Sequence, residues 1–560
     1  MKRLLLLSAC LLAACSGAPE RTEVLQTPQG PVQGIVSAGN PDIVSYQGLP
    51  FAAPPVGGLR WAPPQAARPW TDVRDAGAFG QRCMQPEGTE GGYFERLIDG
   101  HGLSAVKSFA IKRVVAAQTP AVMSEDCLYL NVLSPRGAEA LPVMVWIHGG
   151  GHQFGSADFP YYQADGLVER GVVLVTINYR LGAFGYMAHP ALSADDPRGV
   201  SGNYGTLDQV AALQWVRDTI AAYGGDPNRV TIFGESAGAW SVTEMMSTPL
   251  AAGLFHRAIT QSGASTYHMG QLDGDGRGWP SGHDTGVRVA EALGLEDPSA
   301  AALRAVPADT IRDSLPEGAA DAFHHIRDGV VFPRNVGTAF DTGAIQAVPF
   351  LAGYNADEGT LFFPDDRQPS VWVPELEEGD RAAVAAQLAE AYPEGADRLL
   401  ELYPLHEDWD AHGTRLMGDE IFGVNVRFAA RKAAAAGAPS WLYFWSRVPP
   451  SESQTLGAFH AAEIPFVFGS HEAVLGTTQE DDALTELMIG YWTNFARSGD
   501  PNGPGLPEWP QHEGATWLHL SANTGRPVAR VETDVRAEAL DVLEESLRRN
   551  LDALGAAPIP

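Results

Sequence analysis

Three short apolar runs in the first half of the sequence restrict the chain to a small set of folds. They cover residues 142–147, 171–178 and 229–233, and each has the length of a strand that is buried on both faces. Between the last two runs, the apolar positions 207, 210, 213, 214 and 216 approximate one face of a helix. Strand, helix and strand in this order predict right-handed crossover units, and therefore an α/β fold with a large, mostly parallel central sheet flanked by helices.

A serine follows the third run at once. Gly234, Glu235, Ser236, Ala237 and Gly238 form the only Gly-x-Ser-x-Gly motif of the chain, between the expected strand and a helix expected to begin at Ala237. The two glycines permit a sharp strand-to-helix turn that exposes the serine hydroxyl above the sheet edge. The helix N-terminus favours negative charge beside it. The motif therefore predicts a nucleophile at Ser236, and the alternative is an ordinary turn.

A glycine-rich segment follows the first run in the same way. His148 is followed by Gly149, Gly150 and Gly151. Consecutive glycines allow backbone N–H groups to point at a reacting carbonyl group without side chains in the way. We expect the N–H groups of Gly150, Gly151 and Ala237 to stabilise the oxyanion that forms when the serine attacks. The alternative is a flexible glycine loop.

The first residues resemble an export signal rather than part of the fold. A basic start and a short apolar run lead to the sequence Leu-Ala-Ala-Cys, which ends at Cys15 and resembles the bacterial lipobox. We therefore expect a lipoprotein signal peptide over 1–14, a lipidated Cys15 with a flexible tether over 15–25, and a single domain over 26–560. Ser16 favours an outer-membrane anchor, because Asp at that position is typical of inner-membrane retention. The alternative is a cleaved secretion signal that happens to contain a cysteine.

The remaining cysteines fit an exported protein. Cys10 would leave with the signal peptide and Cys15 would carry the lipid, which leaves Cys83 and Cys127 in an oxidising compartment. We expect a disulfide between them, and closing a loop of this length stabilises a fold by roughly 4 kcal/mol in the chain-entropy model. The alternative is two buried free thiols.

Charge excludes one class of partner. The chain has 38 Lys plus Arg and 68 Asp plus Glu, a formal charge of −30, and its lysines occur only at positions 2, 107, 112 and 432. Such a surface repels phosphate backbones, so we do not expect a nucleic-acid partner. Membrane association is expected only through the N-terminal lipid, and the sequence leaves the oligomeric state open.

Several longer motifs together resemble one known family. They are residues 46–55, 59–61, 124–131, 178–182, 202–205 and 224–238. In these segments the chain is similar to the type-B carboxylesterases, the α/β-hydrolase branch that includes bacterial para-nitrobenzyl esterases, animal carboxylesterases and cholinesterases. The resemblance implies an α/β-hydrolase fold with cap and loop insertions. It also implies a serine hydrolase that cleaves small-molecule carboxylic esters through an acyl-enzyme intermediate, without a cofactor or a metal.

The resemblance also assigns two partners of the serine. Residues 355–360 match the segment that carries the acid, which makes Glu358 the orienting carboxylate and Asp357 its competitor. Residues 457–466 match the segment that carries the base, which makes it His460. The triad would then follow the order Ser, acid, His along the chain, as in α/β-hydrolases.

The same resemblance implies a disulfide between Cys83 and Cys127 and a structural ion pair between Arg60 and Glu125. In cholinesterases the loop closed by this disulfide carries a tryptophan that binds quaternary ammonium. This loop contains no tryptophan, so we do not expect a choline ester as substrate. Apolar residues from 93 to 117 predict a helical cover, which is either a fixed cap or a mobile lid.

Two polar residues are expected to support the site. Glu235 would place a second carboxylate near the histidine and favour its charged form, and the alternative is an exposed acid on a turn. Ser262, by its matching position in the family, would hydrogen-bond the acid of the triad. Two other functions stay open: a non-catalytic binding module like the neuroligins, and an amide or lactone hydrolase with the same triad.

Overall fold

The computed structural model of the chain describes residues 19–86, 89–118, 122–163, 165–266, 269–274, 280–315, 323–362, 369–370, 372–373, 375–389, 391–451, 453–473, 477–522 and 528–555. The expected signal peptide over 1–14 and the lipidation site Cys15 lie outside these residues. Every helix in the described part of the chain is too short or too polar to cross a lipid bilayer.

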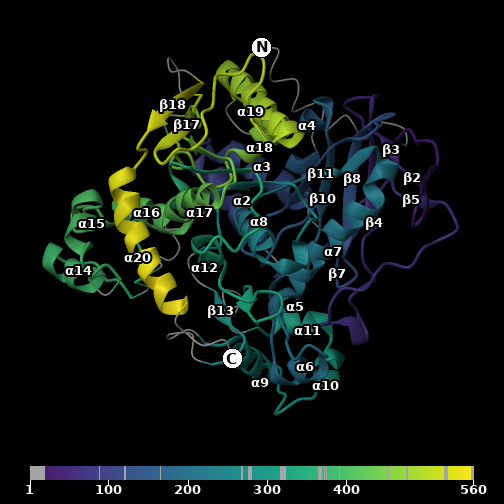
Figure 1. Cartoon of the computed structure of the whole chain (residues 1–560), viewed down its shortest axis with the longest axis horizontal. Helices are drawn as coiled ribbons and strands as arrows, with labels where there is room; N and C mark the ends of the chain where they lie inside the picture. Colours follow the sequence, from purple (N-terminus) through teal and green to yellow (C-terminus); the bar gives the residue numbers. More distant parts are fainter. Residues whose placement is uncertain are drawn as a thin grey trace.

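An eleven-stranded sheet runs through the molecule (Figure 1). From one edge to the other its strands are β3 (Ile35–Val36), β4 (Ile43–Pro50), β8 (Tyr129–Pro135), β10 (Val173–Ile177), β9 (Leu141–Ile147), β11 (Gly225–Glu235), β12 (Arg257–Gln261), β15 (Phe350–Asn355), β16 (Ser440–Trp445), β17 (Thr516–Leu520) and β18 (Ala529–Thr533). Neighbouring strands from β10 to β17 are parallel, and the outer strands pair antiparallel. The predicted mostly parallel sheet is confirmed.

Alternate side chains of the central strands enter two separate cores, because successive residues of a strand point to opposite faces. In β9, Val143 and Val145 belong to one core, whereas Met144 and Trp146 belong to the other. The first core includes side chains of α7 (Tyr204–Thr219), α8 (Ala237–Ser247), α12 (Val336–Asp341), α17 (Val424–Ala435) and α20 (Ala537–Gly555), among other helices. Those of the second are α4 (Gly166–Glu169), α18 (Ile464–Phe468) and α19 (Gln479–Ser498). Both faces of the sheet are therefore covered by helices.

Smaller elements surround these layers. The other helices are α2 (Thr89–Gly100), α3 (Ala105–Gln118), α5 (Gly182–Tyr186), α6 (Pro190–Asp195), α9 (Gly282–Ala292), α10 (Ala300–Ala305), α11 (Ala308–Asp313), α14 (Arg381–Leu388), α15 (Ala396–Leu402) and α16 (Trp409–Gly418). The short strands are β1 (Leu25–Thr27), β2 (Gly30–Gln33), β5 (Arg74–Asp75), β6 (Arg82–Cys83), β7 (Met123–Ser124), β13 (Gly270–Gln271) and β14 (Ile326–Arg327). Figure 1 shows α20, in yellow, between the α14–α15 pair at the left and the body that includes α17. Arg427 of α17 forms an ion pair of 2.9 Å with Glu544 of α20.

Four loops that matter for function leave the carboxyl ends of parallel strands. The glycine loop follows β9, Ser236 follows β11, Glu358 follows β15, and the segment with His460 lies beyond β16. Parallel strands end on the same edge of a sheet, so these loops meet there although they are far apart in the sequence.

Candidate active site

Ser236 occupies the turn between β11 and α8. Its φ of 57° and ψ of −124° lie outside the regions that non-glycine residues usually adopt. Ser236 is partly exposed, whereas its neighbours Glu235 and Ala237 are buried. The following glycine is needed for close packing, because a Cβ at Gly238 would lie 2.0 Å from the backbone oxygen of Ile147. The sheet thus presents the serine at a strained turn, as the motif predicted.

A histidine and two carboxylates lie beside this turn. His460 Nδ1 is 2.6 Å from Glu358 Oε2, and the backbone N–H of Asn355 donates to Glu358 Oε1 over 2.6 Å. The other ring nitrogen, His460 Nε2, is 3.0 Å from Glu235 Oε1. His460, Glu358 and Glu235 are all at most 4 % exposed. The expected second carboxylate near the histidine is therefore present, and Glu235 is not an exposed acid on a turn.

Asp357, the competing acid, has a different role. Its carboxylate accepts a hydrogen bond of 2.7 Å from the backbone N–H of Ala458, and its own N–H donates to the Ala458 carbonyl over 3.0 Å. Asp357 thus fastens the segment that carries His460, while Glu358 contacts the imidazole itself.

The charges around the histidine favour its protonated form. Burial alone lowers the pKa of His460, but the negative charges of Glu235 and Glu358 outweigh it and raise this pKa to about 9. Burial raises the pKa of the Glu235 carboxyl to about 8, and the positive charge of His460 opposes this shift. The arrangement therefore stabilises the imidazolium that forms when His460 accepts a proton.

The glycine loop lies against the serine turn. A Cβ at Gly149 would be 2.7 Å from Glu235 Oε2 and 3.1 Å from Ser236 Cβ, so only a glycine allows this approach. Gly150 and Gly151 have φ values of 102° and 62°. Ala237 is the first residue of α8, so its N–H has no partner within the helix. The three expected oxyanion donors belong to these two adjoining segments.

Ser262 differs from the expectation. It follows β12 with a φ of 49°, and its N–H donates to the Gly353 carbonyl over 2.8 Å. Its hydroxyl is buried and has no hydrogen-bond partner among the described residues. The predicted hydrogen bond from Ser262 to the acid Glu358 is therefore wrong: the Glu358 oxygens contact the Asn355 N–H and His460 Nδ1 instead.

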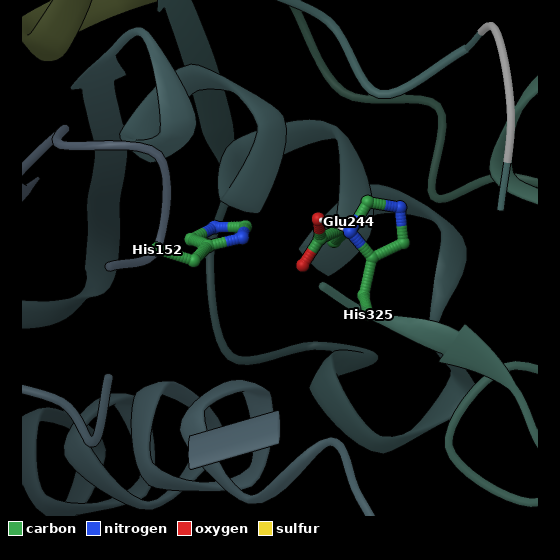
Figure 2. Close-up of side chains that lie close together, drawn as sticks. All are labelled: His152, Glu244 and His325. Carbon is green, nitrogen blue, oxygen red and sulfur yellow. Dashed lines mark ion pairs between the residues drawn. The ribbon is translucent and has the colours of Figure 1, made fainter. Parts of the chain in front are cut away.

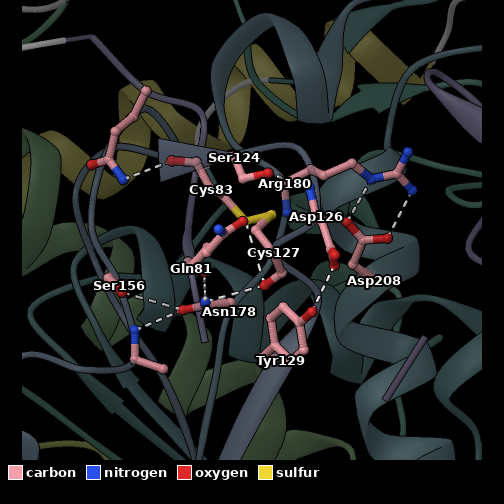
Figure 3. Close-up of a disulfide and its surroundings, with 12 residues drawn as sticks. Gln81, Cys83, Ser124, Asp126, Cys127, Tyr129, Ser156, Asn178, Arg180 and Asp208 are labelled. Carbon is pink, nitrogen blue, oxygen red and sulfur yellow. Dashed lines mark hydrogen bonds and ion pairs between the residues drawn. A yellow bond between two sulfur atoms is a disulfide. The ribbon is translucent and has the colours of Figure 1, made fainter. Parts of the chain in front are cut away.

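The predicted disulfide is confirmed. Cys83 and Cys127 are bonded, with their Cα atoms 4.9 Å apart (Figure 3). Asn178 ties the two sides together, since its Nδ2 donates to the carbonyl oxygens of Gln81 and Cys127, each over 3.1 Å. Nearby, Arg60 and Glu125 form the expected ion pair through two hydrogen bonds of 2.5 and 2.6 Å.

The loop closed by this disulfide covers the histidine. It contains α2 and α3, in agreement with the predicted helical cover. Tyr93 of α2 donates a hydrogen bond of 3.4 Å to the His460 carbonyl, and Leu97 packs on the cluster that includes Leu456 and Phe459. These contacts favour a cap that is packed onto the histidine segment.

Sequence analysis missed several neighbours of the histidine. The rings of Phe362 and Phe422 lie 5.0 and 4.6 Å from the His460 ring, centroid to centroid. Glu463 is fully buried, and its carboxylate accepts hydrogen bonds of 3.0 Å from Gln261 and 2.7 Å from Asn355. Glu463 belongs to the motif that carries the base, so its position in the sequence already indicates that it lies near His460. No local sequence pattern predicts the position of Phe422, because only the tertiary fold brings it near His460.

Another serine, histidine and glutamate lie in contact elsewhere in the described part of the molecule. His325 Nδ1 is 2.8 Å from Glu244 Oε1, and Ser265 Oγ is 2.7 Å from His325 Nε2. Figure 2 shows His325 and Glu244 together with His152, which follows the glycine loop. Ser265 is only 2 % exposed, so an ester cannot reach it as it can reach Ser236.

Comparison with known proteins agrees with this geometry. The sequence profile described as the carboxylesterase family matches residues 21–543. The chain belongs to the carboxylesterase family. It is 36% identical over 525 residues to the fumonisin B1 esterase of Sphingopyxis macrogoltabida, which covers 91% of this chain and 88% of the relative. It is also 32% identical over 576 residues to mouse carboxylesterase 1E, which covers 96% of each.

Solved carboxylesterases share the whole architecture. A carboxylesterase of Geobacillus stearothermophilus aligns with a TM-score of 0.75 at 30% identity, over 93% of this chain and 100% of the other. A structure named PNB esterase aligns with a TM-score of 0.72 at 30% identity, over 93% and 99%. The chain therefore has the α/β-hydrolase fold, and as a member of the carboxylesterase family it is a carboxylic ester hydrolase.

Proposed function

We propose that Ser236, His460 and Glu358 are the catalytic triad of this ester hydrolase. Ser236 Oγ attacks the ester carbonyl carbon while its proton passes to His460 Nε2. The tetrahedral intermediate collapses to an acyl-serine, and the same proton goes to the departing alcohol. A water molecule then attacks the acyl group, gives a proton to His460 and releases the carboxylic acid, while the serine regains its proton.

The contact between His460 and Glu358 is the observation that carries this proposal. At 2.6 Å from the carboxylate, Nδ1 holds the ring proton, which leaves the Nε2 lone pair available on the side of the serine turn. Glu235, 3.0 Å from Nε2, adds a second negative charge that stabilises the imidazolium during acyl transfer.

The oxyanion would be stabilised by backbone groups. The N–H groups of Gly150, Gly151 and Ala237 are the proposed donors, supported by the approach of the glycine loop to Ser236 and by the position of Ala237 at the start of α8. Such donors act in a fixed geometry, and removing one of them typically costs about 10²–10³-fold in kcat.

A fluorophosphonate probe tests the triad directly. We expect the intact protein to gain one covalent adduct, which peptide mapping assigns to Ser236, while Ser236→Ala stays unlabelled. A panel of matched esters, amides and lactones then ranks the substrates. Absence of labelling on the folded protein, or an adduct on another serine, would contradict the mechanism and favour a binding module.

We further propose that the enzyme is a bacterial envelope lipoprotein. A signal peptide over 1–14 would be removed, Cys15 would be lipidated, 15–25 would serve as tether, and 26–560 would form one domain exported to the outer membrane. Intact-mass analysis of membrane-extracted protein should find a chain that begins at a lipid-modified Cys15. Cys15→Ser should release active enzyme into the soluble fraction, and an unmodified N-terminus elsewhere would refute the anchor.

A further inference from the structure

Two histidines and a glutamate, residue types that can bind a metal ion, converge near the glycine loop and outside the proposed triad. His152 comes from the loop after β9, Glu244 from α8, and His325 from the residue before β14 (Figure 2). The three side chains point toward one another, and one ligand atom of each lies within 4.8 Å of the others. His152 and Glu244 are 0 % exposed and His325 is 4 % exposed.

In each histidine, one ring nitrogen forms hydrogen bonds with residues outside the cluster. His152 Nε2 lies 3.0 Å from the Ala237 carbonyl oxygen and 3.0 Å from Ser241 Oγ. His325 Nε2 lies 2.7 Å from Ser265 Oγ. Such outer partners fix the orientation and the tautomer of a metal-binding histidine, so that its second nitrogen keeps a lone pair for the metal.

The remaining polar atoms of the three side chains have few partners. Among the described residues, His152 Nδ1, His325 Nδ1 and Glu244 Oε1 are buried without a hydrogen-bond partner. His325 Nδ1 and Glu244 Oε1 form an ion pair at 2.8 Å, whereas His152 Nδ1 has no such partner among the described residues. Buried polar atoms are rarely left unpaired, because they have lost their water without gaining another partner.

We propose that His152, Glu244 and His325 bind one divalent transition-metal ion, with Zn²⁺ as the expected species. Two imidazoles and a carboxylate suit zinc, whereas Ca²⁺ and Mg²⁺ prefer oxygen ligands alone. With zinc bonds of about 2.0–2.2 Å, tetrahedral ligand atoms lie about 3.3 Å apart. Side-chain rotations would have to bring the three ligand atoms, now within 4.8 Å of one another, to this separation. The ion would stabilise the fold because it would join three segments that are distant in the sequence: the glycine loop, α8 and the residue before β14. None of its ligands belongs to the proposed triad.

Metal binding is measured on the untagged whole chain after treatment with a chelator and dialysis against micromolar ZnSO₄. We expect about one equivalent of bound zinc by elemental analysis, and a zinc-dependent rise in Tm. Replacement by Co²⁺ should give the visible absorption of a low-coordinate cobalt site with nitrogen and oxygen ligands. Less than about 0.1 equivalent of zinc in the wild-type chain would overturn the proposal and leave a plain ion pair.

Matched variants locate the ion. Glu244→Gln and His325→Gln should each lose the bound equivalent, and Ser265→Ala, which removes an outer partner, should weaken affinity about 10–100-fold. His471→Gln is the control, because it breaks another histidine–carboxylate contact, the 2.9 Å pair with Asp482, and should keep the zinc. Circular dichroism identifies folded variants. Zinc that survives in folded Glu244→Gln and His325→Gln would refute the assignment.

Discussion

Two sets of a serine, a histidine and a glutamate differ in what surrounds the serine. One set is Ser236 with His460 and Glu358, and the other is Ser265 with His325 and Glu244. Both sets join a histidine to a glutamate, at 2.6 Å for His460 and Glu358 and at 2.8 Å for His325 and Glu244. Ser265 Oγ lies 2.7 Å from His325 Nε2, whereas Ser236 follows Glu235, which contacts His460 Nε2. Ser446 also contacts a histidine, His519, which pairs with Glu532 at 2.9 Å. The types of residue that gather around a histidine therefore do not identify the catalytic serine.

The surroundings of the serine make the difference. Ser236 sits at a strained turn, is partly exposed and adjoins the glycine loop, whereas Ser265 is buried. A nucleophile needs access and a group that stabilises the oxyanion, in addition to a base. The second set instead surrounds atoms that lack hydrogen-bond partners, which suits an ion better than a substrate.

Replacing each serine should give the largest difference between the two sets. Ser236→Ala should lower kcat for a short-chain nitrophenyl ester on the order of 10⁶-fold, because the nucleophile is lost. Ser265→Ala should change kcat by less than about tenfold, since Ser265 does not touch substrate. Steady-state kinetics on the two folded variants measures both. Comparable losses would mean that the buried set takes part in catalysis.

Replacing the acids should have the next largest effect. Glu358→Gln keeps the shape of the side chain but removes the charge that orients His460, so kcat should fall about 10⁴-fold. Asp357→Asn is the matched control, because an amide oxygen can still accept the hydrogen bond from Ala458. We expect less than about a tenfold loss for this variant. An equal loss in both variants would contradict the assignment of Glu358 as the orienting acid and of Asp357 as a residue that only holds the His460 segment in place.

The sequence predicted those parts of the site that depend on local structure. A strand, a glycine-flanked serine and a helix define the turn at Ser236 within a few residues, and the same holds for Gly149 and its loop. Glu358 and His460 lie too far along the chain for any local pattern, so family motifs were needed to select them. The disulfide of Cys83 and Cys127 followed from both the export prediction and the resemblance.

The remaining contacts depend on side-chain directions that a sequence does not specify. Ser262 follows a strand that ends beside the serine turn, yet its hydroxyl lacks the predicted partner. Phe422 reaches His460 only through the packing of the segment between α16 and α17. Likewise, Glu244 and His325 are 81 positions apart and belong to no motif, so only the folded structure reveals their contact.

The smallest expected effect concerns the charges that surround His460. Only the neutral imidazole can accept the serine proton, so kcat/KM should rise with pH as His460 loses its proton. The charge of Glu235 raises this pKa, and Glu235→Gln should therefore shift the acidic limb of the profile to lower pH by about one to three units. Glu463→Gln should shift it less, because Gln261 and Asn355 already neutralise part of that charge through hydrogen bonds. A shift to higher pH in Glu235→Gln, or a larger shift in Glu463→Gln, would show that Glu235 is not the carboxylate that tunes the base.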